Sequence, residues 1–566
     1  MRAPWPVLTA ILCLPAFAES RPDPKAISIY PFTGQSGGTF TAILRGSGLA
    51  GATGVASGDA PFAVSVEGAE TEQTSTGRGK TVSDLVKLRV QVAPGARPGR
   101  YPVRVITRNG VSNALPIHIV QSAVDPEPPG SHENQDSAVA VPALPAVYSG
   151  RLSRRGETDY YSFQAQAGQT LTFEVISGLP QIAAAGSAAT VANFDPSITI
   201  YQAGGSWFDP KRLKRIAYND EPVWVFGKPT DAYLQHRFEA AGTYLLRIEA
   251  FAGQGGPDYG YALKITPGAA PQDPERPARN WEERTWTRRL DPGRLSQLAA
   301  RGGKPGAGKQ IETYRGTPEG AVFKIPGSIE GALVQPGETH RARFHLEKPA
   351  DIAIEVETPA AAPPYFNPIV RLLNAAGEEV ATNVLVGRGA CSGAITKSAQ
   401  AKTLVPLRDT GDYTVEIRDA TADLAGADFR YRVQLRPQVP HVGQVKIDTD
   451  HLNLETGQSK TVLVVFDREE DFRGAVTVAA ESLPPGVSAM AGADFEPDKD
   501  PPPPSARRER YVPRTERLVL VLSAAADAPA SVQPQDVRLV VRPLVDGKQG
   551  EVLSKKSFPL MVVAKP

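Results

Sequence analysis

The sequence predicts an all-β protein built from several sandwich domains in series, and three observations support this fold class. The chain has 566 residues, and at about 100–200 residues per domain this length predicts three to five domains. Glycine and proline contribute 52 residues each, while 41% of the residues are hydrophobic. Turn-forming residues therefore interrupt apolar sequence at short intervals, which favours many short strands, joined by Pro/Gly-rich linkers, over long helices.

The first 18 residues are typical of a signal peptide. Arg2 precedes an apolar run over residues 7–14, and Ala16-Phe17-Ala18 has the small-x-small spacing that signal peptidase accepts. We expect a mature start near Glu19 and an exported protein that is periplasmic, cell-surface or extracellular. No later segment approaches about 20 consecutive apolar residues, so no transmembrane span is expected.

The two cysteines add little to this picture. Cys13 lies between two leucines, which fits a lipoprotein cleavage site poorly, although lipidation is the alternative to simple cleavage. After cleavage only Cys391 remains, so no intramolecular disulfide is possible and stability must come from hydrophobic cores.

The charge balance excludes one class of partner. Lys and Arg number 62 and Asp and Glu number 61, so the chain has no net field that would hold a nucleic acid or an anionic membrane. We therefore expect no nucleic-acid partner.

Residues 22–121 are predicted to form the first sandwich. Short apolar stretches at 26–30, 40–44, 85–92, 101–106 and 116–120 are separated by glycine-rich turns. The motifs from Gly38 to Leu49, from Pro94 to Tyr101 and from Asn109 to Asn113 resemble the IPT/TIG immunoglobulin-like family. The resemblance covers the whole stretch and implies an immunoglobulin-like sandwich.

Residues 150–265 and 331–435 are similar enough to be two copies of one unit. Residues 150–157 align with 331–338, 194–196 with 366–368, and 242–249 with 411–418. In the last pair, apolar and polar side chains alternate strictly, as they do in 171–175 and 352–357, and this period of two predicts half-buried antiparallel strands. The predicted domains are 122–268 and 321–437. Residues 269–320 between them are expected to be a linker, with a possible short helix at 290–301.

These repeats resemble the bacterial pre-peptidase C-terminal domain, a calcium-associated jelly-roll sandwich that accompanies secreted enzymes and is not itself catalytic. The resemblance implies that calcium ligands come from the acidic connector, at Glu133 and Asp136, and from the following segment, at Glu157 and Asp159. The proline and asparagine usual in the family's connector are replaced here, so a solvated acidic connector is the alternative. The second repeat has His340 where Asp159 stands and lacks an acidic connector, so it is not expected to bind calcium.

Residues 441–566 are predicted to form the last sandwich, because apolar stretches resume at 461–466, 475–479, 517–522, 537–541 and 558–563. Residues 467–476 and 483–487 resemble immunoglobulin-like domains that follow such modules in bacterial surface proteins. Residues 500–505 contain four consecutive prolines and are typical of a solvated polyproline loop.

Motifs that suggest catalysis lack the structural context that each needs. Residues 46–51 satisfy G-x-G-x-x-G, but the sequence that follows cannot form the required helix. Ser36 stands in a G-x-S-x-G pattern that is followed by a strand, not a helix. His340 and His345 are five residues apart, which places them on opposite faces of a strand. No H-E-x-x-H or C-x-x-C pattern occurs, and no enzymatic activity is predicted.

Aromatic residues suggest a second kind of site. Trp207 and Trp224 lie near Tyr218 in a part of the first repeat that is longer than its counterpart in the second. Extra loops at the ends of sandwiches often carry binding, so these residues are candidates for a sugar or peptide platform. Ordinary packing of a long loop is the alternative.

The sequence therefore predicts a non-catalytic secreted or cell-envelope protein that binds or scaffolds a polysaccharide or protein ligand and is stabilised by calcium. The alternative is a secreted hydrolase that is rich in accessory domains. It would need a catalytic domain of about 150 residues or more, and the four sandwiches leave only the linker. A purely structural spacer is a third possibility. The oligomeric state is not indicated.

Overall fold

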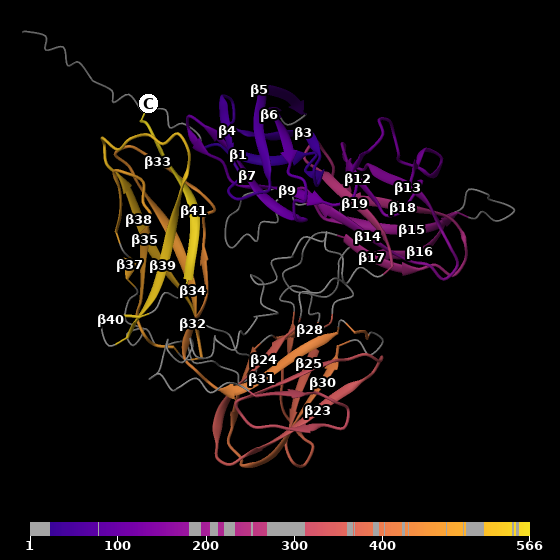
Figure 1. The fold of residues 1–566 in the computed structure, drawn as a ribbon, viewed down its shortest axis with the longest axis vertical. Coiled ribbons are helices and arrows are strands. Elements are labelled where there is room, and N and C mark those ends of the chain that lie inside the picture. The colour runs from indigo at the N-terminus through magenta and orange to yellow at the C-terminus, as the bar shows by residue number, and fades with distance from the viewer. Residues whose placement is uncertain are drawn as a thin grey trace, which may run out of the picture.

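In the computed structural model the chain folds into four β-sandwiches (Figure 1). The element η1 (Gln135–Ser137) is a short 3₁₀ turn, and no described helix is long and apolar enough to cross a membrane. The predicted signal peptide, Trp207, Trp224, Cys391, residues 290–301 and residues 500–505 lie outside the described residues. The structure describes residues 23–76, 79–179, 194–203, 213–219, 232–250, 253–268, 312–358, 366, 368–388, 395–400, 402–420, 425–427, 429–470, 472–490, 492–493, 514–545, 548–550 and 554–565.

The N-terminal sandwich (residues 25–120) packs the sheet β1-β3-β6-β5 against the sheet β2-β9-β7-β4, to which β8 is added beside β7. Alternate residues of β6, among them Val86, Leu88 and Val90, are fully buried in its core. The strands are β1 (Lys25–Tyr30), β2 (Thr33–Gln35), β3 (Thr39–Ser47), β4 (Ala52–Ala56), β5 (Phe62–Thr76), β6 (Gly79–Val92), β7 (Gly99–Thr107), β8 (Gly110–Val111) and β9 (Leu115–Val120).

The first repeat (residues 125–267) consists of the sheets β10-β12-β19-β14-β17 and β11-β13-β18-β15-β16. Its core contains an aromatic group in which Phe163 contacts Phe173, Phe238 and Tyr244. The strands are β10 (Asp125–Pro126), β11 (Val139–Ala140), β12 (Ala146–Arg151), β13 (Thr158–Ala165), β14 (Thr170–Ser177), β15 (Pro196–Ala203), β16 (Leu213–Asn219), β17 (Ala232–Arg237), β18 (Gly242–Ala250) and β19 (Gly260–Pro267).

The second repeat (residues 312–437) has the same topology, with the sheets β20-β22-β31-β24-β29 and β21-β23-β30-β25-β26 and a separate hairpin β27-β28. The predicted relationship between the two repeats is thus confirmed at the level of strand order. The strands are β20 (Glu312–Arg315), β21 (Ala321–Val322), β22 (Gly327–Ala332), β23 (Thr339–Leu346), β24 (Ala350–Glu357), β25 (Pro368–Leu373), β26 (Glu379–Thr382), β27 (Val384–Arg388), β28 (Ile395–Ala399), β29 (Lys402–Leu407), β30 (Gly411–Asp419) and β31 (Arg430–Pro437).

The C-terminal sandwich (residues 441–563) consists of the sheets β32-β34-β38-β36 and β33-β41-β39-β35-β37, with β40 paired to β39. Val462, Val464 and Phe466 of β34 are fully buried between them. The strands are β32 (His441–Ile447), β33 (Leu452–Glu455), β34 (Ser459–Glu469), β35 (Val476–Glu481), β36 (Val487–Met490), β37 (Gly492–Ala493), β38 (Arg514–Ala524), β39 (Gln535–Val545), β40 (Lys548–Gln549) and β41 (Ser554–Val563).

The N-terminal sandwich contacts both the first repeat and the C-terminal sandwich. Ile176 and Ala262 of the first repeat belong to its hydrophobic core cluster, so these two domains share a core. On its other side, the side-chain amide of Asn453 accepts a hydrogen bond from the N–H of Val111 at 2.8 Å and donates one to its carbonyl at 2.9 Å. We call this second contact the clasp. It brings the last sandwich against the first, although some 340 residues separate them along the chain (Figure 1).

The structure differs from the sequence-based description in two places. Residues 312–315 fall in the predicted linker, yet they form β20, which pairs in parallel with β22. The predicted half-burial holds for β18 and β30. It does not hold for β14 and β24, whose polar residues Glu174, Glu355 and Glu357 are buried as well. Glu355 pairs there with Lys402 and Arg436 of the same repeat.

Candidate metal centre

Three carboxylates converge at one end of the first repeat. Glu127 directly follows β10, and its N–H donates to the carbonyl of Ser149 at 2.9 Å, which extends the parallel pairing with β12. Glu157 lies in the turn before β13, and Asp159 is the second residue of β13, with its side chain directed inward. The three carboxylates are close together, because the negative charges of Glu127 and Glu157 both raise the pKa of Asp159.

Each of these carboxylates has one oxygen fixed by a donor from the protein. The N–H of Arg151 donates to Glu127 at 3.1 Å, and the N–H of Arg154 donates to Glu157 at 2.8 Å. The hydroxyl of Tyr261 donates to Asp159 at 2.6 Å. The other oxygen of Glu127, Oε1, is buried and receives no hydrogen bond in the structure. The donors thus orient the carboxylates and leave oxygens that can face a cation.

The surroundings make negative charge costly at this position. Burial, followed by the charge of Glu127, raises the pKa of Asp159 to about 8, and burial also raises the pKa of Glu127. Tyr161 and Tyr261 are fully buried and their hydroxyls are 2.9 Å apart. The charges of Glu127 and Asp159 disfavour each other's ionisation, so sharing one proton between the two carboxyls or placing a cation beside them would relieve the repulsion.

The predicted ligands are only partly brought together. Glu157 and Asp159 belong to the cluster. Glu133 instead forms an ion pair with the guanidinium of Arg154, and Asp136 is exposed in η1, where its N–H donates to Asn134. Sequence reasoning missed Glu127. The available signal was its position in the acidic connector, where Asp125-Pro-Glu127 precedes Glu133 and Asp136.

In the second repeat, the positions that correspond to Glu127 and Asp159 hold other residue types. Gly316 takes the place of Glu127, because its N–H donates to the main-chain carbonyl of Glu330 at 2.7 Å in the same parallel pairing. His340 takes the place of Asp159, with its two ring nitrogens 2.7 Å from the Tyr431 hydroxyl and 2.8 Å from Glu338. Burial opposes ionisation of Glu338, but the hydrogen bond with His340 lowers its pKa. An imidazole thus occupies the space that carboxylates line in the first repeat.

A glycine shared by both repeats is explained by the same arrangement. A Cβ atom at Gly150 would lie 2.3 Å from the ring of Tyr261, and one at Gly331 would lie 2.6 Å from the hydroxyl of Tyr431. The tyrosine that approaches the cluster crosses directly over this glycine in each repeat. The aligned glycines therefore mark the position of the tyrosine.

The donor set of the first repeat fits calcium. Calcium prefers six to eight oxygen ligands, several of them carboxylates, and Glu127, Glu157 and Asp159 offer oxygen atoms only. The second repeat, with a histidine and a glycine in place of two of these carboxylates, does not offer the same set.

The remaining candidates from the sequence are placed as follows. Tyr218 on β16 is 47% exposed, with the guanidinium of Arg215 5.9 Å from its ring centre; Trp207 and Trp224 are outside the described residues. Ser36 lies in a turn, and residues 46–51 are followed by β4, not by a helix. His340 is buried and His345 is exposed, which confirms that they face opposite sides of β23.

Comparison with known proteins gives distant similarities only. No family model matches the chain, and no curated protein matches it. The pre-peptidase C-terminal domain of a collagenase from Bacillus anthracis is similar at 15% identity over 23% of this chain and 98% of that one, with a TM-score of 0.14. Domains 4 and 5 of the S-layer protein SbsC are similar at 10% identity over 38% of this chain and 100% of that one, with a TM-score of 0.15.

A third similarity is to the secreted serine protease VesC from Vibrio cholerae, at 10% identity over 44% of this chain and 52% of that one, with a TM-score of 0.15. All three TM-scores lie far below 0.5. The function proposed below is therefore based on the contacts within this chain.

Proposed function

We propose that this chain is a non-catalytic, exported protein that binds or scaffolds a polysaccharide or protein ligand, and that calcium stabilises its first repeat. The observation that supports the calcium part is the convergence of Glu127 and Glu157, which are partly buried, with the buried Asp159, where Glu127 Oε1 receives no hydrogen bond. The second repeat supports it by contrast, since His340 there bridges Glu338 and Tyr431.

The non-catalytic part of the proposal is supported by the organisation of the chain. The described residues form four sandwiches with filled hydrophobic cores. The longest stretch outside them that lies between two domains is 269–311, which is shorter than the size at which a domain builds its own core. Within these 566 residues, the rival hydrolase would have to place its catalytic residues on the sandwiches or in the shorter stretches between them.

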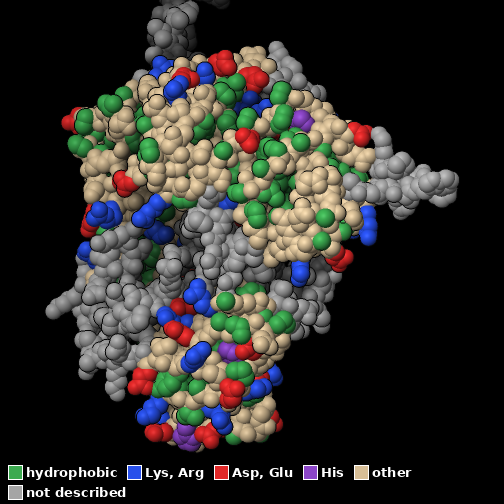
Figure 2. Space-filling model, turned by 45° about the vertical axis from the view of Figure 1, so that its right-hand side comes forward, with side chains coloured by type: hydrophobic (Ala, Val, Ile, Leu, Met, Phe, Trp, Pro, Cys, Tyr) green, Lys and Arg blue, Asp and Glu red, His purple; other side chains and the backbone are tan. Residues whose placement is uncertain are grey.

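The surface supports a role in binding proteins or sugars over one in binding polyanions. Lys, Arg, Asp and Glu side chains are interspersed on the face shown in Figure 2, as the near-zero net charge predicts. A field of mixed sign gives little attraction for a nucleic acid.

The calcium part is tested by thermal unfolding of residues 19–566 with millimolar calcium, and with magnesium for comparison. We expect calcium to raise the melting temperature of the transition that belongs to the first repeat, because a ligand present at about 100 times its Kd adds about 2.7 kcal/mol. Glu127→Gln should abolish the shift. Glu133→Gln is the matched control, since Glu133 is paired with Arg154, and it should retain most of the shift. No shift in the wild type would refute calcium binding.

The binding part is tested by a pull-down of the same chain over insoluble polysaccharides, collagen-like matrix and whole cells, with and without calcium. Retention on one of these materials supports a binding module. Retention on none of them favours a spacer or a subunit with one specific protein partner.

A further inference from the structure

A tyrosine of the N-terminal sandwich reaches the candidate metal centre of the first repeat. Tyr30 is the last residue of β1, and its hydroxyl donates to the carbonyl of Ser149 at 3.2 Å. The guanidinium of Arg151 lies over its ring, 4.8 Å from the ring centre. Burial raises the pKa of the Tyr30 phenol, and the charges of Glu127 and Asp159 raise it further. The phenol therefore lies within electrostatic range of the carboxylates.

The two residues that Tyr30 contacts are the same two that position Glu127. The carbonyl of Ser149 accepts the N–H of Glu127 at 2.9 Å, and the N–H of Arg151 donates to Oε2 of Glu127 at 3.1 Å. The first contact fixes the main chain of Glu127, and the second fixes one oxygen of its carboxylate. The Ser149 carbonyl thus accepts two donors, one from each domain. A displacement of Tyr30 would loosen both residues that orient this carboxylate.

The two domains meet closely where the first repeat has glycine. A Cβ atom at Gly260 would lie 2.7 Å from the ring of Tyr30, and one at Gly178 would lie 2.5 Å from the ring of Phe32. Both rings therefore rest directly on main chain of the first repeat. Gly260 immediately precedes Tyr261, whose hydroxyl donates to the cluster. The contact between the domains and the candidate metal centre thus share a strand, β19.

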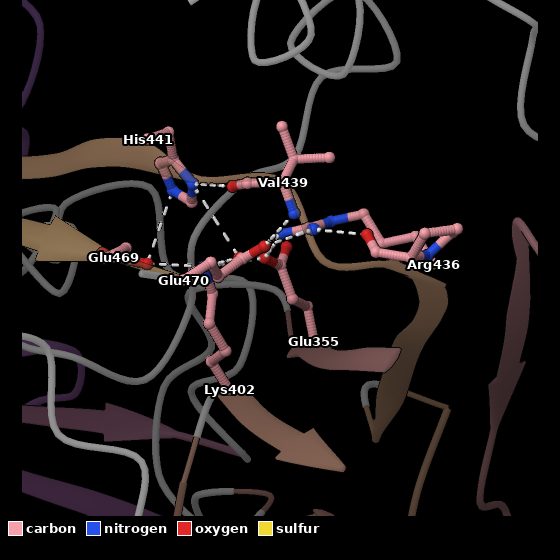
Figure 3. A network of polar contacts seen from close by, with 8 residues as sticks. Glu355, Lys402, Arg436, Val439, His441, Glu469 and Glu470 are labelled. Atoms are coloured by element: carbon pink, nitrogen blue, oxygen red, sulfur yellow. Dashed lines mark hydrogen bonds and ion pairs between the residues drawn. The ribbon is translucent and has the colours of Figure 1, made fainter. Parts of the chain in front are cut away.

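The surface that receives the N-terminal sandwich is apolar in the first repeat and charged in the second. Ile176 and Ala262 pair across β14 and β19 and join the core of the N-terminal sandwich. Glu357 and Arg432 pair at the equivalent positions of β24 and β31, with their charged groups 3.6 Å apart. The second repeat meets the C-terminal sandwich farther along β31, at Arg436 (Figure 3). The contact of Tyr30 thus belongs to the repeat whose carboxylates fit calcium.

We propose that Tyr30 is a positioning residue of the candidate metal centre, which holds Ser149 and Arg151 so that Glu127 faces the cation. Docking of the N-terminal sandwich thereby strengthens calcium binding by the first repeat. This inference rests on the calcium site proposed above. Groups that orient a metal ligand contribute to affinity because the ligand is already in place when the metal arrives. Since coupling between two binding events is reciprocal, calcium strengthens the docking of the N-terminal sandwich by the same factor.

The first test is a calorimetric titration of calcium into residues 19–566. Tyr30→Leu removes both the hydroxyl and the aromatic ring and should raise the Kd for calcium about tenfold. Tyr30→Phe keeps the ring beside Arg151 and should raise the Kd by a smaller factor. Ser28→Ala is the matched control, because Ser28 lies on the same strand and its hydroxyl donates to Asp258 of the first repeat. It weakens the same domain contact without touching the residues that hold Glu127, so it should leave the Kd unchanged.

The second test is hydrogen exchange of the amides of β1 in the same chain, with and without calcium, read by mass spectrometry. Calcium should slow this exchange in the wild type and in Ser28→Ala, and it should have less effect in Tyr30→Leu.

The outcomes separate this inference from the proposed function. A wild type that binds no calcium overturns both. If the wild type binds calcium and Tyr30→Leu has the same Kd, the calcium site stands and the role of Tyr30 is overturned. The role is also overturned if Ser28→Ala raises the Kd as much as Tyr30→Leu does, because a general weakening of the domain contact then explains the effect. Should Tyr30→Leu fail to fold, a Kd of Tyr30→Phe equal to that of the wild type overturns the role.

Discussion

The substitution Asp159→Asn should make the first repeat more stable at alkaline pH when calcium is absent. Asp159 is 1% exposed, and its pKa is about 8, raised from an ordinary value of 3.8 by burial and by Glu127. Between these two values the folded chain holds a proton that the unfolded chain has released. Stability therefore falls as pH rises through this window, by about 1.4 kcal/mol per pH unit.

The whole window corresponds to at most about 6 kcal/mol, an upper bound because Glu127 shares the proton. The asparagine side chain of the variant carries no charge at any pH. It keeps the acceptor for the Tyr261 hydroxyl and gains a donor for Glu127. The free energy of unfolding of the variant should therefore depend much less on pH between pH 4 and pH 8 than that of the wild type. In the wild type, calcium should replace the shared proton, so its affinity should rise toward pH 8.

The assay is hydrogen exchange of the amides of β13, read by mass spectrometry and corrected for the pH dependence of intrinsic exchange. It reports the first repeat separately from the other three sandwiches. Asp412→Asn is the control, because Asp412 is an exposed carboxylate on a strand of the second repeat that pairs with His345. The assignment of a coupled pair, Glu127 and Asp159, would be refuted if the stability of the wild-type first repeat did not change between pH 4 and pH 8. It would also be refuted if the stability of Asp159→Asn fell with pH as steeply as that of the wild type.

Three further predictions concern the other domains. Burial opposes the ionisation of Glu470, but hydrogen bonds from Arg436 lower the pKa of this carboxyl to about 2. The stability that the lowered pKa adds is full above about pH 4.5 and falls by about 3 kcal/mol as the pH drops toward 2. Acid unfolding of Glu470→Gln should lack this loss when it is compared with the wild type. Asn453→Ala leaves the N–H and carbonyl of Val111 without partners and should weaken the clasp by about 1–3 kcal/mol, seen as faster exchange at β8. Gly331→Ala places a Cβ 2.6 Å from the hydroxyl of Tyr431 and should destabilise the second repeat by about 1–3 kcal/mol in thermal unfolding, whereas Gly242→Ala, with no atom within 4 Å of its Cβ, should show no such clash.

Local patterns predicted the fold well. The alternation in residues 242–249 and 411–418 is what the buried faces of β18 and β30 require, and the correspondence between repeats extends to strand order. The alternation of apolar and polar residues along a strand indicates which face of the strand is buried in its own domain. It cannot show whether another domain covers the opposite face. Glu355 has the sequence signature of a solvent-facing residue, yet it is buried, paired with Arg436 and Lys402 of its own repeat and close enough to Glu470 of the C-terminal sandwich for that charge to act on it.

The candidate site was only partly predictable for a related reason. Glu157 and Asp159 are adjacent to a strand whose register the repeat defined. Glu127 reaches them through a parallel pairing of β10 with β12, which involves two residues and leaves no periodic trace in sequence. Several acidic residues in the connector were therefore equivalent candidates until the strand was placed.

The clasp also gives the molecule a defined response to mechanical load. Because Asn453 joins the last sandwich to Val111 of the first, a force applied between the two ends of the chain crosses this small contact before it is transmitted through the two repeats. This contact consists of the hydrogen bonds of Asn453, those of Asp450 with Arg104 and Ala114, the ion pair of Lys460 with Asp23, and the apolar cluster of Ile106, Val111 and Met561. It yields more easily than a sandwich with a complete core. The contact would open first, extending the molecule while every domain stays folded, and it could close again when tension is released.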